Sequence, residues 1–167
     1  MYKKELILLL AAAILLLVLI YTIDVGITPT NNQIRNEQVN AITIEYSNGT
    51  NARENVYIAN TPIEQATGLM YMNSMENCNG IGNCYGMLFV FPNSSDECFW
   101  MKNTEMPLKQ FWIYNNTIIY EIRGIPYSLK SFCHYGNYVL EASINSSLGI
   151  GDHIYFNYLN GSGYKRN

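Results

Sequence analysis

The residue types best suited to chemistry lie together in "CFWMKNTEMPL", the stretch from Cys98 to Leu108. It places an aromatic ring, an amine, an amide and a hydroxyl side by side at Trp100, Lys102, Asn103 and Thr104. Such side chains can form a shallow polar pocket for a small ligand or glycan, here with Trp112 as a second aromatic wall. These residues are the candidate ligand-binding site, together with Glu141 from a later strand.

A structural interpretation competes with this binding site. In it Phe99 and Met101 pack the core, the amide and hydroxyl bond turn backbone, and Lys102 makes a salt bridge. Strand alternation would put Trp100 and Lys102 on one face and Phe99 and Met101 on the other. Pro107 is excluded from the middle of a central strand, so residues 103–106 are expected to form a loop at the rim of the sheet.

No catalytic constellation is recognisable in the sequence. The chain lacks a Gly-x-Ser-x-Gly elbow, a His-Glu-x-x-His motif and a phosphate-binding glycine loop. Glu121 and Glu141 are single acids in expected strands, where an acid is usually solvated or salt-bridged. We therefore expect a domain without enzymatic activity; the alternative is a small enzyme acting at a rim of Lys102, Asn103 and Glu141.

The four cysteines predict two disulfides. Cys78 and Cys84 bracket "NGIGN", a loop flexible enough to bring them into disulfide range, and Cys98 would then join Cys133 in the loop 126–137. A redox or zinc role is the competing interpretation, but Cys-x-x-Cys spacing is absent and the only histidines are His134 and His153.

Methionines give a third functional hypothesis. Met70, Met72 and Met75 are closely spaced, and thioethers outside the cell can bind copper(I). Because methionine also fills core space, we assign no metal site and no cofactor.

The N-terminus predicts a membrane anchor. Residues 6–23 form an uncharged run of 18 residues without Pro or Gly, about the length of a transmembrane helix. Lys3 and Lys4 precede it, and the next basic residue is Arg35, so the N-terminus is expected in the cytoplasm and the rest outside. A cleaved signal peptide is the alternative. The expected organisation is an anchor (1–26), a polar spacer (27–40), an extracytoplasmic domain (41–160) and a tail (161–167).

Sequons and charge are in keeping with that placement. Five Asn-x-Ser/Thr sequons are candidate glycosylation sites, at Asn48, Asn93, Asn115, Asn145 and Asn160. The net charge is −3 without a basic cluster, which argues against nucleic acid or anionic lipid headgroups as partners. The expected partners are the membrane, through the N-terminal helix, and an envelope protein or glycan.

Apolar alternation and turn residues predict an all-β domain. About eight short strands and one short helix indicate a compact sandwich or barrel of jelly-roll type. Thr61, Pro62 and Glu64 form a helix-capping box, and the face containing Ile63 and Met70 is expected to pack on the sheet. The expected strands are 42–46, 56–59, 86–91, 98–102, 108–114, 118–125, 138–142 and 153–159. The first two are expected to form a hairpin, and Asn115-Asn116 is the expected turn of a second hairpin between 108–114 and 118–125.

Three stretches resemble one family in order and spacing: "TPIEQATGLMYMNSM", the long segment from "GMLFVF" to "IIYEI", and "YVLEASINSSLGIGDHI". The chain is similar over residues 42–158 to the uncharacterised family called domain of unknown function 192. That resemblance implies a compact jelly-roll or barrel domain in exported or membrane-anchored prokaryotic proteins, without an established activity, substrate or cofactor. This chain departs from the family pattern at Lys109 and at Ala142-Ser143, and its loop with Cys78 and Cys84 resembles an addition.

Overall fold

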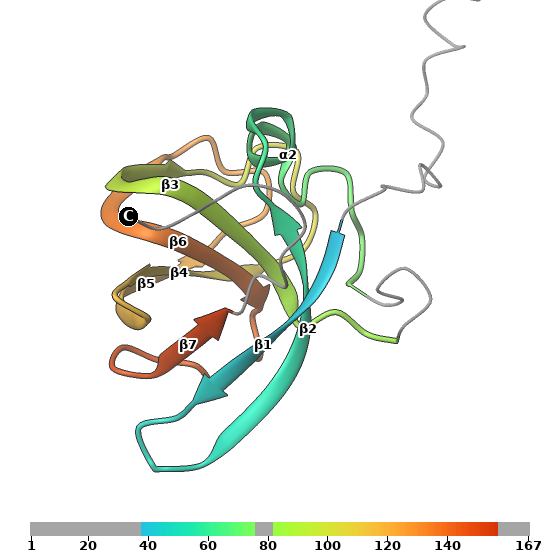
Figure 1. Cartoon of the computed structure of the whole chain (residues 1–167). Helices are drawn as coiled ribbons and strands as arrows, with labels where there is room; N and C mark the ends of the chain where they lie inside the picture. The colour runs from blue at the N-terminus through green and yellow to red at the C-terminus, as the bar shows by residue number, and fades with distance from the viewer. Residues whose placement is uncertain (1–37, 76–81, 157–167) are drawn as a thin grey trace, which may run out of the picture. The chain divides into compact units, whose positions relative to one another are not determined.

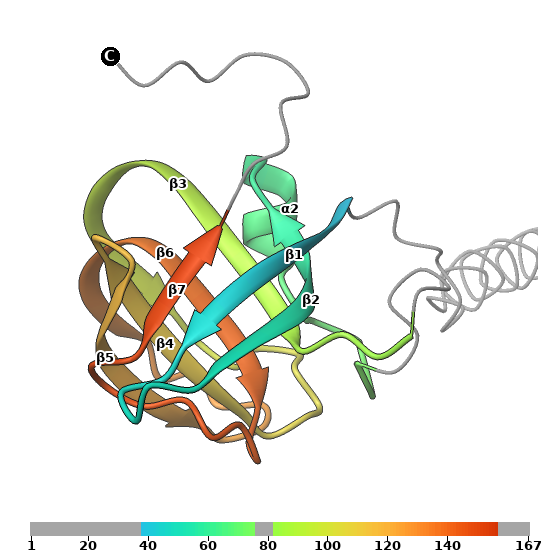
Figure 2. The same ribbon diagram turned by 60° about the horizontal axis from the view of Figure 1, so that its bottom comes forward.

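Seven strands close into a barrel in the computed structural model, which describes residues 38–75 and 82–156. The order around the barrel is β1-β2-β3-β6-β4-β5-β7 (Figure 1), and the turned view shows β7 beside β1, where the barrel closes (Figure 2). The elements are β1 (Gln38–Glu45), β2 (Asn51–Ala59), α2 (Pro62–Thr67), β3 (Gly86–Phe99), β4 (Leu108–Tyr114), β5 (Thr117–Gly124), β6 (Phe132–Ser143) and β7 (His153–Phe156).

The predicted anchor, the spacer up to residue 37 and the tail 161–167 lie outside the described residues. Within the described ranges, no helix is long and apolar enough to cross a membrane. β1 begins at Gln38, so three residues that the sequence pattern assigned to the spacer are paired with β2.

Turn chemistry fixes the two tight hairpins. Gly49, with φ of 84°, turns the chain between β1 and β2. Between β4 and β5, Asn115 and Asn116 have φ of 50° and 63°. Asparagine tolerates this left-handed conformation, and two such residues in a row match the twist of an antiparallel pair. Both predicted hairpins are therefore confirmed.

The prediction of separate strands at 86–91 and 98–102 is wrong. One strand, β3, runs from Gly86 to Phe99, and its pairing with β6 shifts register between Val90 and Ser95. Pro92 falls in that irregular section, where no ladder hydrogen bond is needed from its nitrogen. β6 likewise begins at Phe132, within the expected loop 126–137. The barrel therefore has seven strands, two of them long, instead of eight short ones.

Side chains cover β3, β6 and β4 on both faces. Leu88, Phe111 and Leu140 point into the barrel and pack with the first hydrophobic cluster. The alternate positions, among them Met87 and Trp112, point outward into a second cluster that is closed over by Leu69, Phe99 and Met101. The loops that follow α2 and β3 thus cover the outside of the barrel.

Helix α2 begins as predicted but presents its face differently. The Thr61 side chain accepts a hydrogen bond from the Glu64 amide, and the Glu64 carboxylate accepts one from the Thr61 amide. The expected packing of Ile63 is wrong, because that side chain is 79% exposed and the helix buries none of its residues. Burial starts just after the helix, at Gly68 and Leu69.

The predicted disulfide Cys98–Cys133 is confirmed. The two residues are cross-strand neighbours in the ladder between β3 and β6, with their Cα atoms 4.0 Å apart. Cys133 therefore lies in a strand, where the sequence pattern suggested a loop. Cys84 is also disulfide-bonded, while its predicted partner Cys78 lies outside the described residues.

Gly86 tests how closely β3 and β6 must approach. A Cβ atom there would lie 2.0 Å from the carbonyl oxygen of Glu141 and 3.1 Å from the Cα of Ala142, both in β6. Gly86→Ala should therefore lower the free energy of unfolding by about 2 kcal/mol, as overpacking does. The nearest atom to a Cβ at Gly149 is 3.8 Å away, so Gly149→Ala should change it by less than about 0.5 kcal/mol. Urea unfolding followed by circular dichroism compares the two; equal effects would contradict the expected strand contact.

Candidate functional site

A cavity of about 420 Å³ lies on the outer face of the barrel, beside the end of α2. Its walls come from β3, from the end of α2 and from the loop after β3. Leu69, Phe89, Phe91 and Phe99 make it largely apolar, and Glu141 from β6 also lines it. We call this cavity the Glu141 pocket.

Strand register brings Glu141 into this apolar setting. It lies opposite Met87 of β3 and Gln110 of β4, so all three project from the outer face of the sheet. The second cluster covers that face, and Glu141 is only 5% exposed. A carboxyl group in the centre of this sheet is therefore buried by its position alone.

Gln110 supplies the polar contact to this carboxyl. Its Nε2 donates to Glu141 Oε1 over 2.9 Å, and it also lies 3.7 Å from the sulfur of Met101. The other oxygen, Oε2, lies on the side of Gly68, where an added Cβ would be 3.9 Å from it. Across residues 38–75 and 82–156, no basic side chain pairs with Glu141, so the expectation of a solvated or salt-bridged acid is wrong for this residue.

Burial has a direct effect on the protonation of Glu141. It raises the pKa of the carboxyl from 4.5 to about 7, because the charged form loses its hydration, while the hydrogen bond from Gln110 opposes that rise. Near neutral pH both protonation states are therefore populated. The group can accept a hydrogen bond or ion pair as the carboxylate and donate one as the acid.

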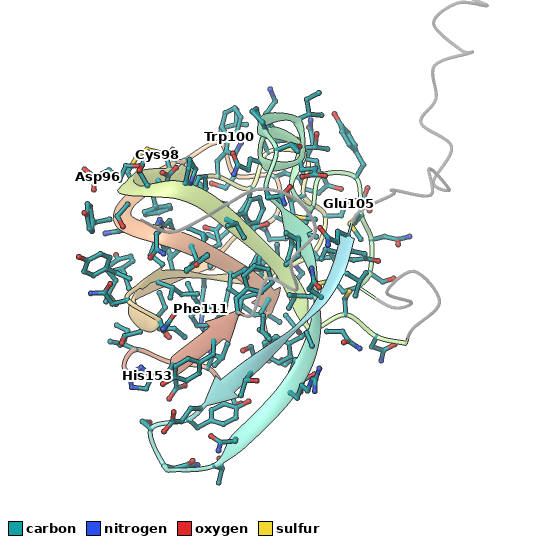
Figure 3. All side chains as sticks on the ribbon, viewed as in Figure 1. Asp96, Cys98, Trp100, Glu105, Phe111 and His153 are labelled. Atoms are coloured by element: carbon teal, nitrogen blue, oxygen red, sulfur yellow. A yellow bond between two sulfur atoms is a disulfide. The ribbon has the colours of Figure 1, made fainter. Side chains whose placement is uncertain are left out.

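Trp100 and Thr104 also line the Glu141 pocket. Thr104 is buried, and its hydroxyl donates to the Lys102 carbonyl over 3.3 Å. Trp100 is 42% exposed, and Figure 3 shows it projecting at the end of the barrel that carries α2. Three of the five predicted ligand-binding residues, Trp100, Thr104 and Glu141, therefore converge on one cavity.

Lys102 and Asn103 lie beside the pocket rather than in it. The Lys102 ammonium is 5.0 Å from the centre of the Trp100 ring, a cation–π arrangement in place of the expected salt bridge. Asn103 has φ of 53°, and its Nδ2 donates to the Tyr71 hydroxyl over 2.6 Å. Its carbonyl also accepts the Tyr71 amide over 2.8 Å. These contacts join the loop after β3 to the segment after α2.

Trp112 does not form the second aromatic wall that the sequence suggested. It is fully buried in the second cluster, where its ring meets Phe99 edge to face, and its Nε1 donates to the Glu97 carbonyl over 2.8 Å. The aromatic walls come instead from Phe89, Phe91 and Phe99. Sequence reasoning also missed Gln110, although an uncharged polar residue within the largely apolar strand "LKQFWIY" is the kind of signal that marks a buried hydrogen bond.

The described residues contain no group of three His, Cys, Asp or Glu side chains that could hold a metal ion.

The methionines lie at two different places in the described residues. Met87 and Met101 fill the second cluster. A separate cavity of about 320 Å³ is lined by Met75, Met106 and Cys84, and Cys84 is disulfide-bonded. His134 stacks on Tyr120, with ring centres 3.4 Å apart.

The molecule is a closed barrel with a buried carboxyl group at a pocket on its outer face, and this arrangement by itself identifies no activity. The profile of the DUF192 family, described as an uncharacterised ACR, matches residues 43–153. The chain therefore belongs to the DUF192 family. No curated protein matches it.

Two crystal structures share the fold. A Sinorhizobium meliloti 1021 protein, provisionally described as a transcription regulator, is 25% identical over 71% of this chain and 94% of that chain, with a TM-score of 0.64. A protein of unknown function from Novosphingobium aromaticivorans DSM 12444 is 22% identical over 74% of this chain and 89% of that one, with a TM-score of 0.62.

The buried carboxyl predicts a specific pH dependence of stability. Its folded pKa of about 7 lies above its ordinary value of 4.5, so the folded protein binds this proton more tightly than the unfolded chain does. Burial of Glu141 therefore costs least below pH 4.5, where the carboxyl is protonated in both the folded and the unfolded chain. The free energy of unfolding then falls by about 3 kcal/mol as the pH rises through 7. Glu141→Gln should remove that slope and make the protein more stable than wild type at pH 8.

Urea unfolding at a series of pH values measures this difference. Glu105→Gln is the matched control, since Glu105 is exposed and should leave the wild-type slope unchanged. A Glu141→Gln variant with the wild-type slope would show that Glu141 is ionised in the folded protein at no cost.

Proposed function

We propose that the domain binds a small ligand in the Glu141 pocket, and that the ligand has an apolar body ending in an amine. The observation that carries this proposal is a buried carboxyl that lines an apolar pocket, with its Oε1 held by Gln110 and no basic side chain paired with it among the described residues. A ligand ammonium would supply a further donor and a countercharge.

The composition of the walls favours this ligand over a sugar. A sugar needs a polar partner for nearly every hydroxyl, whereas the pocket walls include four large apolar side chains from Leu69, Phe89, Phe91 and Phe99. Of the two carboxyl groups that line the pocket, Glu97 and Glu141, only Glu141 is buried, and it can pair with one strong donor of the ligand.

The proposal places this domain outside the cell on a membrane anchor. The uncharged run 6–23 with Lys3 and Lys4 before it supports a single span with the N-terminus in the cytoplasm. The disulfide Cys98–Cys133 suits an oxidising compartment. Four of the sequon asparagines, Asn48, Asn93, Asn115 and Asn145, are exposed, and Asn160 lies outside the described residues. Protease accessibility of the C-terminal domain on intact cells tests this orientation.

Binding of phenethylamine tests the pocket. Because the carboxylate is the form that pairs with an ammonium, affinity for phenethylamine should rise as the pH increases through about 7. Glu141→Gln should weaken binding at pH 8 by about tenfold, the loss of one charge-assisted contact. Isothermal titration calorimetry on the full chain measures both effects.

The controls separate the carboxyl from the apolar walls. Glu105→Gln should bind phenethylamine like wild type, and the neutral analogue 2-phenylethanol should bind without the pH dependence. If methyl glucoside binds more tightly than phenethylamine, or if Glu141→Gln leaves amine affinity unchanged, the proposed ligand class is wrong.

Proton-transfer catalysis at Glu141 is the second candidate function. A carboxyl with a pKa of about 7 can give and take a proton near neutral pH, which is what a general acid or base needs. Of the three residues that the sequence suggested for an active site, only Glu141 lines the pocket. Lys102 contacts Trp100 instead, and Asn103 contacts Tyr71. Turnover of a bound ligand that Glu141→Gln abolishes while keeping binding would favour this second candidate.

A further inference from the structure

Four exposed apolar side chains lie on two loops next to the Glu141 pocket. Ile125, Tyr127 and Leu129 are 72%, 60% and 68% exposed on the loop between β5 and β6, and Trp100 is on the loop after β3. We call Trp100, Ile125, Tyr127 and Leu129 the apolar surface. Nothing in the ligand-binding proposal uses the three residues of the β5–β6 loop.

Backbone hydrogen bonds hold these two loops together. The Met101 amide donates to the Ser128 carbonyl over 3.0 Å, and the Tyr127 amide donates to the Thr104 carbonyl over 3.2 Å. The β5–β6 loop also closes on itself, through the Ser128 amide and the Ile125 carbonyl at 3.1 Å. The apolar side chains therefore point outward from a braced loop.

The backbone of Tyr127, one of these exposed residues, is in an unusual conformation. Its φ of 62° lies in the left-handed region, which is unfavourable for a residue with a Cβ atom. The loop keeps a large aromatic residue at a position where glycine would be easier to accommodate. An exposed tyrosine held at a conformational cost indicates a partner for its side chain.

Basic side chains flank this apolar surface. The sequence has no basic cluster, which argued against anionic lipid, but the fold gathers three of the five lysines and arginines of the described ranges, Lys102, Arg123 and Lys130, within the two loops or next to them. One exposed acid, Glu105, also lies on the loop after β3. Lys130 lies over the Phe132 ring, 4.6 Å from its centre. Trp and Tyr rings with aliphatic side chains and a border of Lys and Arg are the composition of segments that enter the headgroup layer of a membrane.

The way the chain enters the barrel favours the same partner. Gln38 pairs with Ile58, three residues before the Thr61 cap of α2, and the Tyr71 amide after α2 bonds the Asn103 carbonyl. The chain thus enters the barrel at the end where the apolar surface lies. The 14 residues from Asp24 to Glu37 reach at most about 50 Å when fully extended, which keeps an anchored domain within contact of the bilayer.

We propose that the apolar surface docks on the interfacial layer of the membrane that residues 6–23 span, with Lys102, Arg123 and Lys130 against anionic headgroups. This inference rests on the anchor in the proposed function and is independent of the ligand in the pocket. Docking would set the mouth of the Glu141 pocket close to the lipid headgroups.

Trp100 makes this docking measurable. The full chain is reconstituted in vesicles of equimolar phosphatidylcholine and phosphatidylglycerol, with and without phosphatidylcholine brominated high on the acyl chains. Trp100 emission should fall by about half with brominated lipid, since its ring would enter the interface. The only other tryptophan, Trp112, is fully buried, so a Trp100→Phe variant reports the remaining unquenched signal.

Matched variants connect the quenching to the loop. Ile125→Asp with Leu129→Asp should keep the chain in the vesicles but abolish Trp100 quenching. Ile150→Asp alters an equally exposed isoleucine outside this surface, 62% exposed, and should leave the quenching intact. Pure phosphatidylcholine vesicles should give weaker quenching, because the basic side chains lose their anionic partners.

Flotation of the same vesicles separates the docking proposal from the membrane-anchor proposal. A chain that floats with the vesicles without Trp100 quenching overturns docking and leaves the anchor intact. A chain that does not float overturns both. If Trp100 is shielded from aqueous iodide but not reached by brominated lipid, a protein partner or a second copy covers the surface, and the membrane proposal is wrong.

Discussion

Three neighbouring strands, β3, β6 and β4, are covered by side chains on both faces, and the main features of the molecule follow from that coverage. The inner face fills the barrel, and the outer face is closed over by the segments after α2 and β3. A polar residue in the covered part of these strands is therefore buried whichever way it points, as Gln110 and Glu141 are. Glu141 and Gln110 point outward, which puts a carboxyl group against apolar side chains with an amide as its hydrogen-bond partner. The site is a product of sheet packing more than of loop sequence.

Local sequence signals predicted local structure well. The capping box before α2, the Asn115-Asn116 hairpin and the pairing of Cys98 with Cys133 each depend on a few neighbouring residues or on cysteine arithmetic, and all three were found. The number of strands was wrong because Pro92 looks like a strand end, whereas a bulge in β3 accommodates it. Ile63 was misassigned because helical spacing identifies a face without showing whether anything covers it.

Only part of the candidate site could be predicted, because strand register and not local sequence brings its residues together. Trp100, Thr104 and Glu141 were identified from a short motif and one strand acid, and they do converge. Their convergence depends on the register of β6 against β3 and β4, which no short stretch of sequence contains. That register also decides that Gln110, and no lysine, faces Glu141. The acid is therefore buried with a raised pKa, where sequence alone suggested an ordinary surface glutamate.

Closure of the barrel rests on its shortest strand. β7 has four residues; it pairs with β1 over all four but with β5 only at Thr117 and His153. Among the described residues, β7 covers the edge of β1 along its own four residues but leaves most of β5 beyond Thr117 without a strand neighbour on that side. The seam between β5 and β7 is where the ladder is thinnest, so local opening is expected to start there. Such an opening would uncover the edge of β1 and the rest of the edge of β5 together and turn a self-contained barrel into an open sheet that can recruit a neighbour's strand.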